Sequence, residues 1–448
     1  MYRKESKTIQ KWLDTTKKAL LVTGARQTGK TWLIRDEIKK SSYRLFEINF
    51  IDQPDMVNYF STNMSAEDFL IRLRMIMPDD CRPHETVVFF DEIQKCPQIV
   101  TKIKFLVDDG SFKYIMSGSL LGVELKGISS VPVGYLRILR MYPMDFEEFM
   151  IACGISRITI DKLAERFVSL NPVEEYMHDR VLSLFYIYLI VGGMPEAVLK
   201  YVETKDLREV QSIQNDITEL YKEDFSQYEQ EDKKLKIKSI YEIIPSELNK
   251  QNKRFIFTML DKELKFDRYE NSFLWLKDAG VALPVYNVEA PVIPLTASKS
   301  TNVFKLFSSD TGLLTSCYPL STKIELINKN GDVNNGAHFE NAVVQQLTAN
   351  GFTPYYCKKK KTGELDFLIE MNGKAVPVEV KSGSDYKDHA ALDNYMAVKD
   401  YHLNQAFVLC NGNIEKQNNI IYLPVYMTYL IKEKEADSMM VDVDLSDL

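Results

Sequence analysis

Short apolar runs alternate with helix-like stretches between residues 19 and 149. Four of these runs are strand candidates: ALLVTG, RLFEINF, TVVFFDE and YIMSGS. Their near-continuous hydrophobicity favours strands that are buried on both faces of a sheet. Strands separated by helical patterns are typical of a parallel sheet covered by helices. The first third of the chain is therefore predicted to be an α/β domain.

The periodicity becomes mostly helical from Ile151 to Tyr228, with a VGGMP turn signal at residues 191–195. We interpret this middle part as a helical lid or linker. Its apolar run from Val181 to Val191 is shorter than the roughly 18 residues that a membrane span requires. We therefore expect a buried helix there and no membrane partner.

The third part, from Lys233 to Leu295, has three helical patterns followed by two brief strands, LPVYNV and PVIPL. That order fits a winged-helix-like module, with a generic helical bundle as the alternative. Helices and strands alternate again from Asn334 to Leu430, which predicts a small α/β domain. The final residues are acidic and are expected to form a loosely ordered tail.

The predicted fold class is α/β, with a parallel sheet, a helical and winged-helix-like middle, and a C-terminal α/β domain. The expected segments are 1–150 for the first domain, 151–228 for the helical lid or linker, 229–330 for the winged-helix-like domain, 331–433 for the C-terminal domain and 434–448 for the tail.

Composition narrows the classes of function. The 448 residues include 56 Lys and Arg against 63 Asp and Glu, which gives a formal net charge of −7. A surface for DNA or RNA would therefore have to be a local patch. The six cysteines are scattered without a C-x-x-C pair, so neither a disulfide framework nor a zinc knuckle fits. The polar N-terminal stretch lacks the apolar core of a signal peptide, and we expect a cytoplasmic protein.

One glycine-rich segment carries specific chemistry because it lies between a predicted strand and a predicted helix. It fits G-x-x-x-x-G-K-[ST], and its residues are Gly24, Ala25, Arg26, Gln27, Thr28, Gly29, Lys30 and Thr31. The glycines let backbone N–H groups curl around phosphate oxygens. Lys30 would reach the β- and γ-phosphates of ATP, and the Thr31 hydroxyl would bind Mg²⁺.

A second motif supports this nucleotide site. The apolar strand TVVFF ends in two carboxylates, Asp91 and Glu92. Asp91 would hold the magnesium through water, and Glu92 would act as the catalytic residue that orients or polarises the attacking water. A buried strand capped by solvated acids is the alternative for this strand alone. The two motifs together favour ATP and Mg²⁺ as cofactors.

Three further residues are weaker candidates at the same site. Ser117 ends a strand that should lie beside the acid strand, which would bring its hydroxyl near the γ-phosphate as a sensor. An ordinary strand-to-loop turn explains it equally well. Arg137 and Arg140 are candidates for an arginine finger, or simply surface charges at the edge of the domain.

The C-terminal part contains a second set of charged residues. Two predicted strands, ELDFLI and VPVEVK, should pair as a hairpin that turns at residues 371–373. Because side chains alternate along a strand, Glu379 and Lys381 share one face, where Asp366 of the adjacent strand can meet them. Glu340 would reach in from a helix. Oxygen ligands of this kind suit Mg²⁺ or Mn²⁺.

Such a cation could bind a scissile phosphate through Asp366 and Glu379, while Lys381 stabilises developing charge or helps to activate water. The alternative is a solvated sheet face with a cross-strand ion pair. The lysine run at residues 358–361 could contact a phosphate backbone, or it could form a solvated turn.

Eight stretches together resemble a widespread prokaryotic family of AAA-type ATPases joined to an uncharacterised C-terminal domain with a restriction-endonuclease-like PD-(D/E)xK core. They are GARQTGKT, VVFFDEIQK, the SGS strand end, YPMDFEEF, VGGMPEAV, FENAVVQQL, ELDFLIE and VPVEVKSG. The resemblance spans nearly the whole chain. It implies a P-loop NTPase sheet at the N-terminus and a restriction-endonuclease-like α/β domain at the C-terminus.

The resemblance also implies roles for individual residues. Lys30 and Thr31 would contact the nucleotide, Asp91 the magnesium, and Glu92 would be the catalytic acid. The nuclease-like site would consist of Glu340, Asp366, Glu379 and Lys381. Many members have Gly-Arg before the YP-x-x-F-x-E-F stretch, whereas this chain has Gly134-Tyr135, so the resemblance assigns no finger arginine.

Two functions follow from these patterns. The first is an ATPase whose nucleotide state controls a nuclease-like half acting on DNA or RNA. The alternative is a nucleotide-dependent switch or scaffold that binds a protein partner and whose nuclease-like domain is catalytically silent. A helicase-like translocase is less favoured because the composition shows no strongly basic channel. A homo-oligomer is a further expectation, since such ATPases commonly complete their site from a neighbour.

Overall fold

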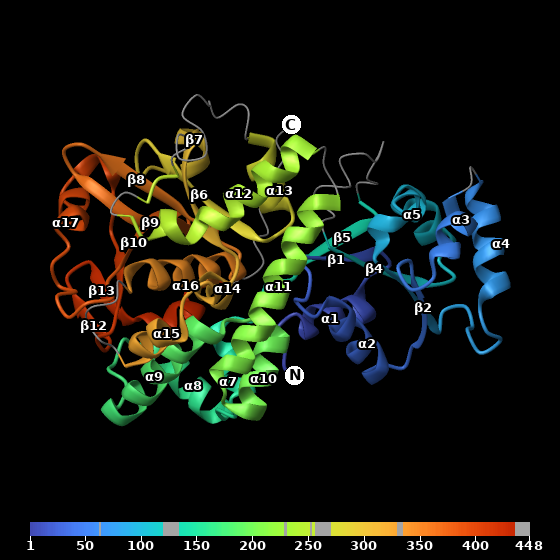
Figure 1. Cartoon of the computed structure of the whole chain (residues 1–448), viewed down its shortest axis with the longest axis horizontal. Helices are drawn as coiled ribbons and strands as arrows, with labels where there is room; N and C mark the ends of the chain where they lie inside the picture. The colour runs from blue at the N-terminus through green and yellow to red at the C-terminus, as the bar shows by residue number, and fades with distance from the viewer. Residues whose placement is uncertain are drawn as a thin grey trace, which may run out of the picture.

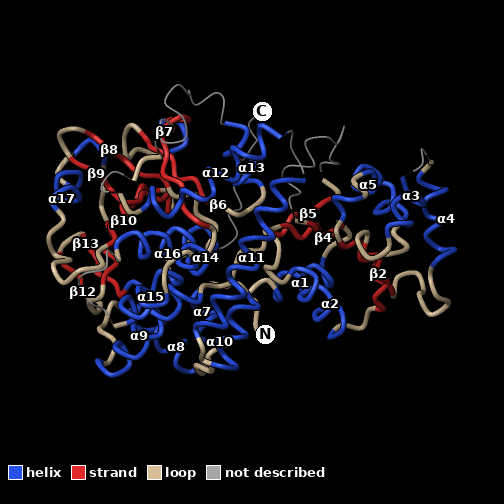
Figure 2. Tube along the Cα trace, in the orientation of Figure 1, coloured by secondary structure: helices blue, strands red, loops and turns tan. Residues whose placement is uncertain are grey.

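The computed structural model describes residues 1–61, 64–119, 134–227, 231–250, 253–255, 270–328 and 335–434. Figure 2 shows the strands of these residues in two groups, one in each half of the molecule. The long helix α11, Leu207–Gln227, runs between the two halves (Figure 1). The tail predicted at 434–448 lies, apart from Lys434, outside the described residues.

The N-terminal half is built on a five-stranded sheet in the order β2-β3-β4-β1-β5. All neighbouring strands are parallel. The bounds are β1 Ala19–Thr23, β2 Arg44–Asn49, β3 Thr86–Asp91, β4 Lys113–Gly118 and β5 Leu136–Arg140. The first four match the predicted strands. The fifth, LRILR, lies at the sheet edge with mostly exposed residues, so it lacks the apolar run by which the others were recognised.

Helices cover both faces of this sheet. One face packs against α1 and α2 through residues such as Trp12 and Leu33, and the other packs against α3, α4 and α5 through residues such as Phe69 and Ile103. The bounds are α1 Ser6–Thr15, α2 Lys30–Lys40, α3 Pro54–Ser61, α4 Ala66–Ile76 and α5 Gln98–Asp109. Because helices cover both faces of the sheet, its inner strands are apolar at nearly every position.

The middle of the chain is helical, as predicted. Its helices are α7 Phe146–Ala152, α8 Arg157–Ser169, α9 Glu175–Val191, α10 Pro195–Thr204, α11 and α12 Glu231–Leu248. The apolar run in α9 is buried in the common core, and none of the helices among the described residues is long and apolar enough to cross a membrane. Pro195 begins α10, where its fixed φ and missing N–H cost nothing.

The C-terminal half contains a mixed eight-stranded sheet in the order β12-β13-β11-β10-β9-β8-β6-β7. Its strands are β6 Ala282–Val288, β7 Lys299–Ser308, β8 Tyr355–Lys359, β9 Gly363–Met371, β10 Lys374–Val380, β11 Ala406–Cys410, β12 Glu415–Gln417 and β13 Ile420–Pro424. Its helices are α13 Glu270–Asp278, α14 Thr311–Ser316, α15 Leu320–Ile327, α16 Gly336–Ala349 and α17 Ala390–Met396. The hairpin predicted at 371–373 is present, with positive φ at Asn372 and Gly373.

Two expectations about the third part of the chain are corrected. The stretch PVIPL is not a strand, and the partner of β6 is β7, eleven residues after β6 ends. The hairpin does not end a separate module, because β6 pairs in parallel with β8 beyond the predicted boundary at residue 330. The polar sequence KSTN at the start of β7 hid this strand, since its first residues are not buried.

One large apolar core extends from the middle of the chain into the C-terminal part, which also has a second, smaller core. The large core includes Met144 after the first sheet, Val191 of α9, Phe307 of β7, Phe339 of α16 and Tyr426 near the C-terminus. Segments far apart in the sequence therefore share one buried interior. The predicted α/β class, the parallel N-terminal sheet and the helical middle are confirmed.

Candidate functional site

The glycine-rich loop joins β1 to α2. Gly24 and Gly29 have positive φ, as does Gln27 between them. A Cβ atom on Gly24 would overlap the carbonyl oxygen of Met141, so no larger residue fits there. The loop is thus held in a curled shape by glycines and by its contact with the segment that follows β5.

Lys30 begins α2, and its side chain folds back into this loop. Its ammonium donates hydrogen bonds to the carbonyl oxygens of Gly24, at 3.1 Å, and Ala25, at 2.7 Å. Burial lowers the pKa of Lys30 to about 8. A buried ammonium that donates to carbonyl oxygens can exchange them for phosphate oxygens, which are stronger acceptors.

Asp91 is the centre of a polar cluster at the carboxyl edge of the sheet. The Thr31 hydroxyl donates to its carboxylate at 2.9 Å, and the Asn49 amide donates at 3.2 Å. The Ser117 hydroxyl also donates to it. Parallel strands β2, β3 and β4 end side by side, which explains why residues so far apart in sequence meet here. Thr31 and Asp91 are the residues that would hold Mg²⁺, and their neighbouring oxygens fit a hard cation.

Glu92 follows Asp91 with a positive φ of 54° and lines the same pocket as Lys30 and Thr31. This pocket has a volume of about 400 Å³. The Gln94 amide donates to the Glu92 carboxylate and, at 3.3 Å, to the Ser119 hydroxyl. The predicted catalytic acid is therefore tethered within the pocket by a neighbouring amide.

Helix α11 closes one side of the pocket. The Tyr221 hydroxyl donates to the Arg26 carbonyl oxygen at 3.0 Å, and the Arg26 guanidinium pairs with Asp224 at 2.8 Å. Burial raises the pKa of Asp224 to about 6. A second contact comes from the α13–β6 turn, where a Cβ on Gly280 would lie 3.2 Å from the Ala25 nitrogen. The glycine-rich loop thus touches both the helical middle and the C-terminal half.

The C-terminal carboxylates lie on three elements. Glu340 is on α16, Asp366 on β9 and Glu379 on β10. The Val380 N–H donates to Asp366 at 2.9 Å, and Lys381 pairs with Glu379 at 3.2 Å. The hairpin register places them as the alternation of side chains predicts.

These carboxylates affect one another electrostatically. Burial, followed by the charges of Glu379 and Glu340, raises the pKa of Asp366 well above its usual range. Burial likewise raises the pKa of Glu379. Glu340 Oε2 and Glu379 Oε2 are buried without a hydrogen-bond partner. Unpaired buried oxygens of this kind fit a cation, because a buried carboxylate otherwise needs hydrogen bonds.

Two lysines join this set from earlier in the chain. Lys305 lies on β7, is 1% exposed and pairs with Glu364 at 2.8 Å. Lys253 pairs with Glu340. As the side chains stand, the part of the chain that the structure describes contains no group of three Asp, Glu, His or Cys residues placed to hold a metal.

Three family profiles match the chain in succession. Residues 16–150 match an AAA domain, residues 182–323 match a domain of unknown function, DUF8612, and residues 335–427 match another, DUF4143. The chain carries an AAA-type P-loop ATPase domain. Two domains of unknown function follow it. Among curated proteins, none matches this chain.

Solved structures give distant likenesses. The Walker-type ATPase PABY2304 of Pyrococcus abyssi is 14% identical, with 70% of this chain and 94% of that chain covered and a TM-score of 0.39. The RuvB Holliday junction branch migration motor of Thermotoga maritima is also 14% identical, with 63% and 89% covered and a TM-score of 0.30. At these scores neither likeness bears on function.

The finger candidates lie apart from the nucleotide pocket of the AAA domain. Arg137 and Arg140 are exposed on the edge strand β5. Among the described residues, neither lines the pocket around Lys30, and Arg140 instead lines a cavity of about 290 Å³ behind the glycine-rich loop. A finger role for either stays a prediction that would require a second copy of the chain.

The lysine run before Asp366 is partly engaged. Lys358 pairs with Glu364 at 2.7 Å, and Lys359 donates to the Tyr401 hydroxyl at 2.7 Å. Lys360 and Lys361 are exposed. Two of the four lysines are therefore part of the sheet surface, and contact with a phosphate backbone stays a prediction.

Several residues around the AAA site were missed by sequence reasoning. Asn49 had a usable signal, because it is a polar residue at the end of a predicted strand. Tyr221 and Asp224 had none, because they lie in a helical pattern far along the chain from Arg26, which Tyr221 follows by 195 residues. Arg3, whose guanidinium donates to the Thr28 carbonyl oxygen at 2.9 Å, is equally unmarked in the sequence. Lys305 was detectable as a lone charge in the apolar stretch VFKLF.

Proposed function

We propose that the chain hydrolyses ATP with Mg²⁺ and that its nucleotide state is transmitted to the C-terminal half. Lys30 binds the β- and γ-phosphates, Thr31 and Asp91 hold the magnesium, and Glu92 polarises the attacking water. Mg²⁺ bound there would neutralise charge on the phosphates. The backbone N–H groups of the glycine-rich loop and the start of α2 add positive potential for the phosphates.

The observation that carries the proposal is the direct contact of the nucleotide loop with the rest of the chain. Arg26 within that loop is bound by Tyr221 and Asp224 of α11, and Ala25 touches the turn at Gly280. A loop that reshapes around phosphate must shift one of these contacts. The helical middle and β6 are then the first elements to respond.

Two substitutions test the ATPase. Lys30→Ala should weaken ATP binding by about 100-fold or more, because the loop loses the charge that offsets the phosphates. Glu92→Gln should keep binding within a few-fold and lower the hydrolysis rate by at least about 100-fold. Binding is measured with a fluorescent ATP analogue and turnover by phosphate release. If Glu92→Gln hydrolysed ATP as fast as the parent, Glu92 would not be the residue that polarises the attacking water.

A second candidate function concerns the C-terminal half. Glu340, Asp366, Glu379 and Lys381 lie together, and two of their buried oxygens lack partners. This supports a nuclease-like site that holds Mg²⁺ or Mn²⁺ on a phosphodiester of DNA or RNA, with Lys381 stabilising developing charge. The restriction-endonuclease-like core belongs to this same proposal.

Manganese binding by the whole chain tests this candidate. Asp366→Ala and Glu379→Ala should each remove the calorimetric signal, because hard cations need those oxygens. Lys381→Ala should retain it, since an ammonium is not a ligand. Loss of the signal in Lys381→Ala alone would contradict the proposed division of roles.

The rival function is a nucleotide-dependent scaffold for a protein partner. Salt dependence separates the two, because phosphate contacts release counterions. DNA binding that falls steeply between 50 and 200 mM salt, roughly tenfold per pair of phosphate contacts, favours the nuclease-like function. Absence of DNA and RNA binding at low salt favours the scaffold.

A further inference from the structure

Each C-terminal carboxylate uses one oxygen on a partner within the chain. Asp366 accepts from the Val380 N–H and Glu379 pairs with Lys381. Glu340 pairs with Lys253, which comes from outside the hairpin and α16. The second oxygens of Glu340 and Glu379 stay buried and unpartnered. Glu340 is thus the one of these three whose partner arrives from a distant segment.

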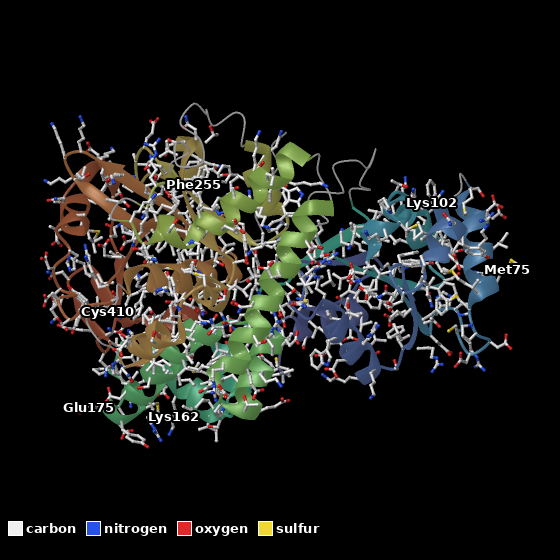
Figure 3. All side chains as sticks on the ribbon, in the orientation of Figure 1. Met75, Lys102, Lys162, Glu175, Phe255 and Cys410 are labelled. Atoms are coloured by element: carbon white, nitrogen blue, oxygen red, sulfur yellow. The ribbon has the colours of Figure 1, made fainter. Side chains whose placement is uncertain are left out.

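The segment that carries Lys253 is anchored against β7. The Phe255 N–H donates to the Phe304 carbonyl oxygen at 2.9 Å. The Phe255 ring stacks on Phe304 with centroids 6.0 Å apart and meets Phe273 edge-on at 4.9 Å. Figure 3 labels Phe255 in the half of the molecule that holds the C-terminal sheet. Two residues before this anchor, Lys253 reaches Glu340, and their side chains are 17% and 6% exposed. The ion pair is therefore placed by the packing of its neighbours.

The other lysines at the cluster have different partners. Lys305 is fully enclosed on β7 and its ion pair is with Glu364. Lys381 directly follows β10 and is tied to Glu379 of that strand. Both glutamates lie on strands of the sheet. Among these three lysines, all in the part of the chain that the structure describes, Lys253 is the one that pairs with Glu340.

We propose that Lys253 is a removable counter-ion of Glu340, so that the carboxylates form a metal site only when the ammonium withdraws. This proposal rests on the nuclease-like function above. It accounts for two observations that otherwise conflict: buried oxygens that need a cation, and side chains that do not yet gather around one.

The physical argument is one of competition. Lys253 binds Oε1 of Glu340, so a divalent cation on the unpartnered Oε2 would lie beside its ammonium. The two positive charges repel each other in a buried site, so binding of Mg²⁺ or Mn²⁺ weakens the charge-assisted hydrogen bond of Lys253. Withdrawal of Lys253 also frees the Glu340 carboxylate on α16 to turn toward Asp366 on β9 and Glu379 on β10.

The test is calorimetric titration of Mn²⁺ into the full chain. Lys253→Met keeps the apolar stem and removes the charge, so it should bind Mn²⁺ at least about tenfold more tightly than the parent. Lys250→Met is the matched control, because Lys250 lies close in sequence and also pairs with a buried glutamate, Glu247. The control should bind Mn²⁺ as the parent does.

A second measurement uses the parent chain, so it does not depend on the folding of a variant. Acetylation of lysines by acetic anhydride is followed by mass spectrometry with and without Mn²⁺. Released Lys253 should react at least several-fold faster when Mn²⁺ is present, while Lys250 should be unaffected.

The outcomes separate the two proposals. Equal Mn²⁺ affinity in parent and Lys253→Met, or an unchanged acetylation rate at Lys253 while Mn²⁺ binds, overturns the role of Lys253 alone. Weaker binding in Lys253→Met does the same. Absence of Mn²⁺ binding in parent and variant at millimolar concentration overturns the metal site itself.

Discussion

Gly193 is a residue at which three distant segments meet. Its carbonyl oxygen accepts from the Met144 N–H at 2.7 Å, and its own N–H donates to the buried carboxylate of Asp310 at 2.6 Å. A Cβ at this position would overlap the carbonyl oxygen of Met144. The glycine at position 193 in VGGMP is therefore required by the close packing of these segments as well as by the turn.

Gly193→Ala should destabilise the chain by at least about 2 kcal/mol, because backbone on both sides would have to move apart. The change is measured as the loss of unfolding free energy in denaturant. Gly383→Ala is the control: a Cβ there meets open space, and its effect should stay within about 0.5 kcal/mol. Equal effects in the two variants would contradict the close packing at Gly193.

At the scale of single residues, motif and structure agree best where the chemistry is local. Lys30 and Thr31 begin one helix, and Asp91 and Glu92 lie at the end of one strand. The parallel sheet therefore had only to bring these two sites together. Asp224 could not be found in this way. Whether Asp224 contributes to the site depends on which helix packs over the glycine-rich loop. Helical periodicity in the sequence does not show how helices pack on other elements.

Among the elements, α11 connects the nucleotide loop to the middle of the chain. It packs against α10, α12 and α14 and carries both residues that contact Arg26. Its length lets it reach from the helical middle to the edge of the AAA domain (Figure 1). A displacement of Arg26 can therefore be transmitted through α11, as one rigid helix, to the middle of the chain.

Asp224→Ala should loosen the end of α11 that faces the loop. Loss of one partly buried ion pair is worth roughly 1.5 kcal/mol, so amides near Tyr221 should exchange hydrogen about tenfold faster in the nucleotide-free protein. Glu219→Ala on the same helix is the control, because Glu219 is exposed and its ion pair is with Lys222. Mass-resolved hydrogen exchange of α11 distinguishes them, and identical exchange in both would show that Asp224 does not hold the helix.

For the whole molecule, the decisive feature is the sheet that crosses the predicted boundary at residue 330. β6 pairs with β8, and α16 packs against α9, α14 and β7. A fragment that begins at residue 331 loses two strands of its sheet and exposes the edge of β8. Exposed strand edges and lost core contacts favour aggregation over folding.

The fragment 331–448 is therefore expected to lack a cooperative thermal transition and to be poorly soluble. The full chain, expressed in the same way, is the control and should unfold cooperatively. Circular dichroism during heating and sedimentation check this. A soluble fragment with a sharp transition would show that the C-terminal part folds without β6 and β7.

The sequence alone determined the features that depend on neighbouring residues. Apolar runs specified four of the five strands of the AAA domain, a motif of eight residues specified its loop, and the Asn372-Gly373 pair specified the hairpin. These succeed because strand burial, loop curvature and turn geometry are set within a few residues.

Only the tertiary structure decided what distant segments do to one another. It placed β7 in the C-terminal sheet although its first residues are polar, brought Lys253 to Glu340, and laid α11 over Arg26. Such contacts depend on how apolar faces are shared in one core, and many packings satisfy the same local pattern. The free energy that selects among them comes from burial summed over the whole chain, which no single stretch of sequence records.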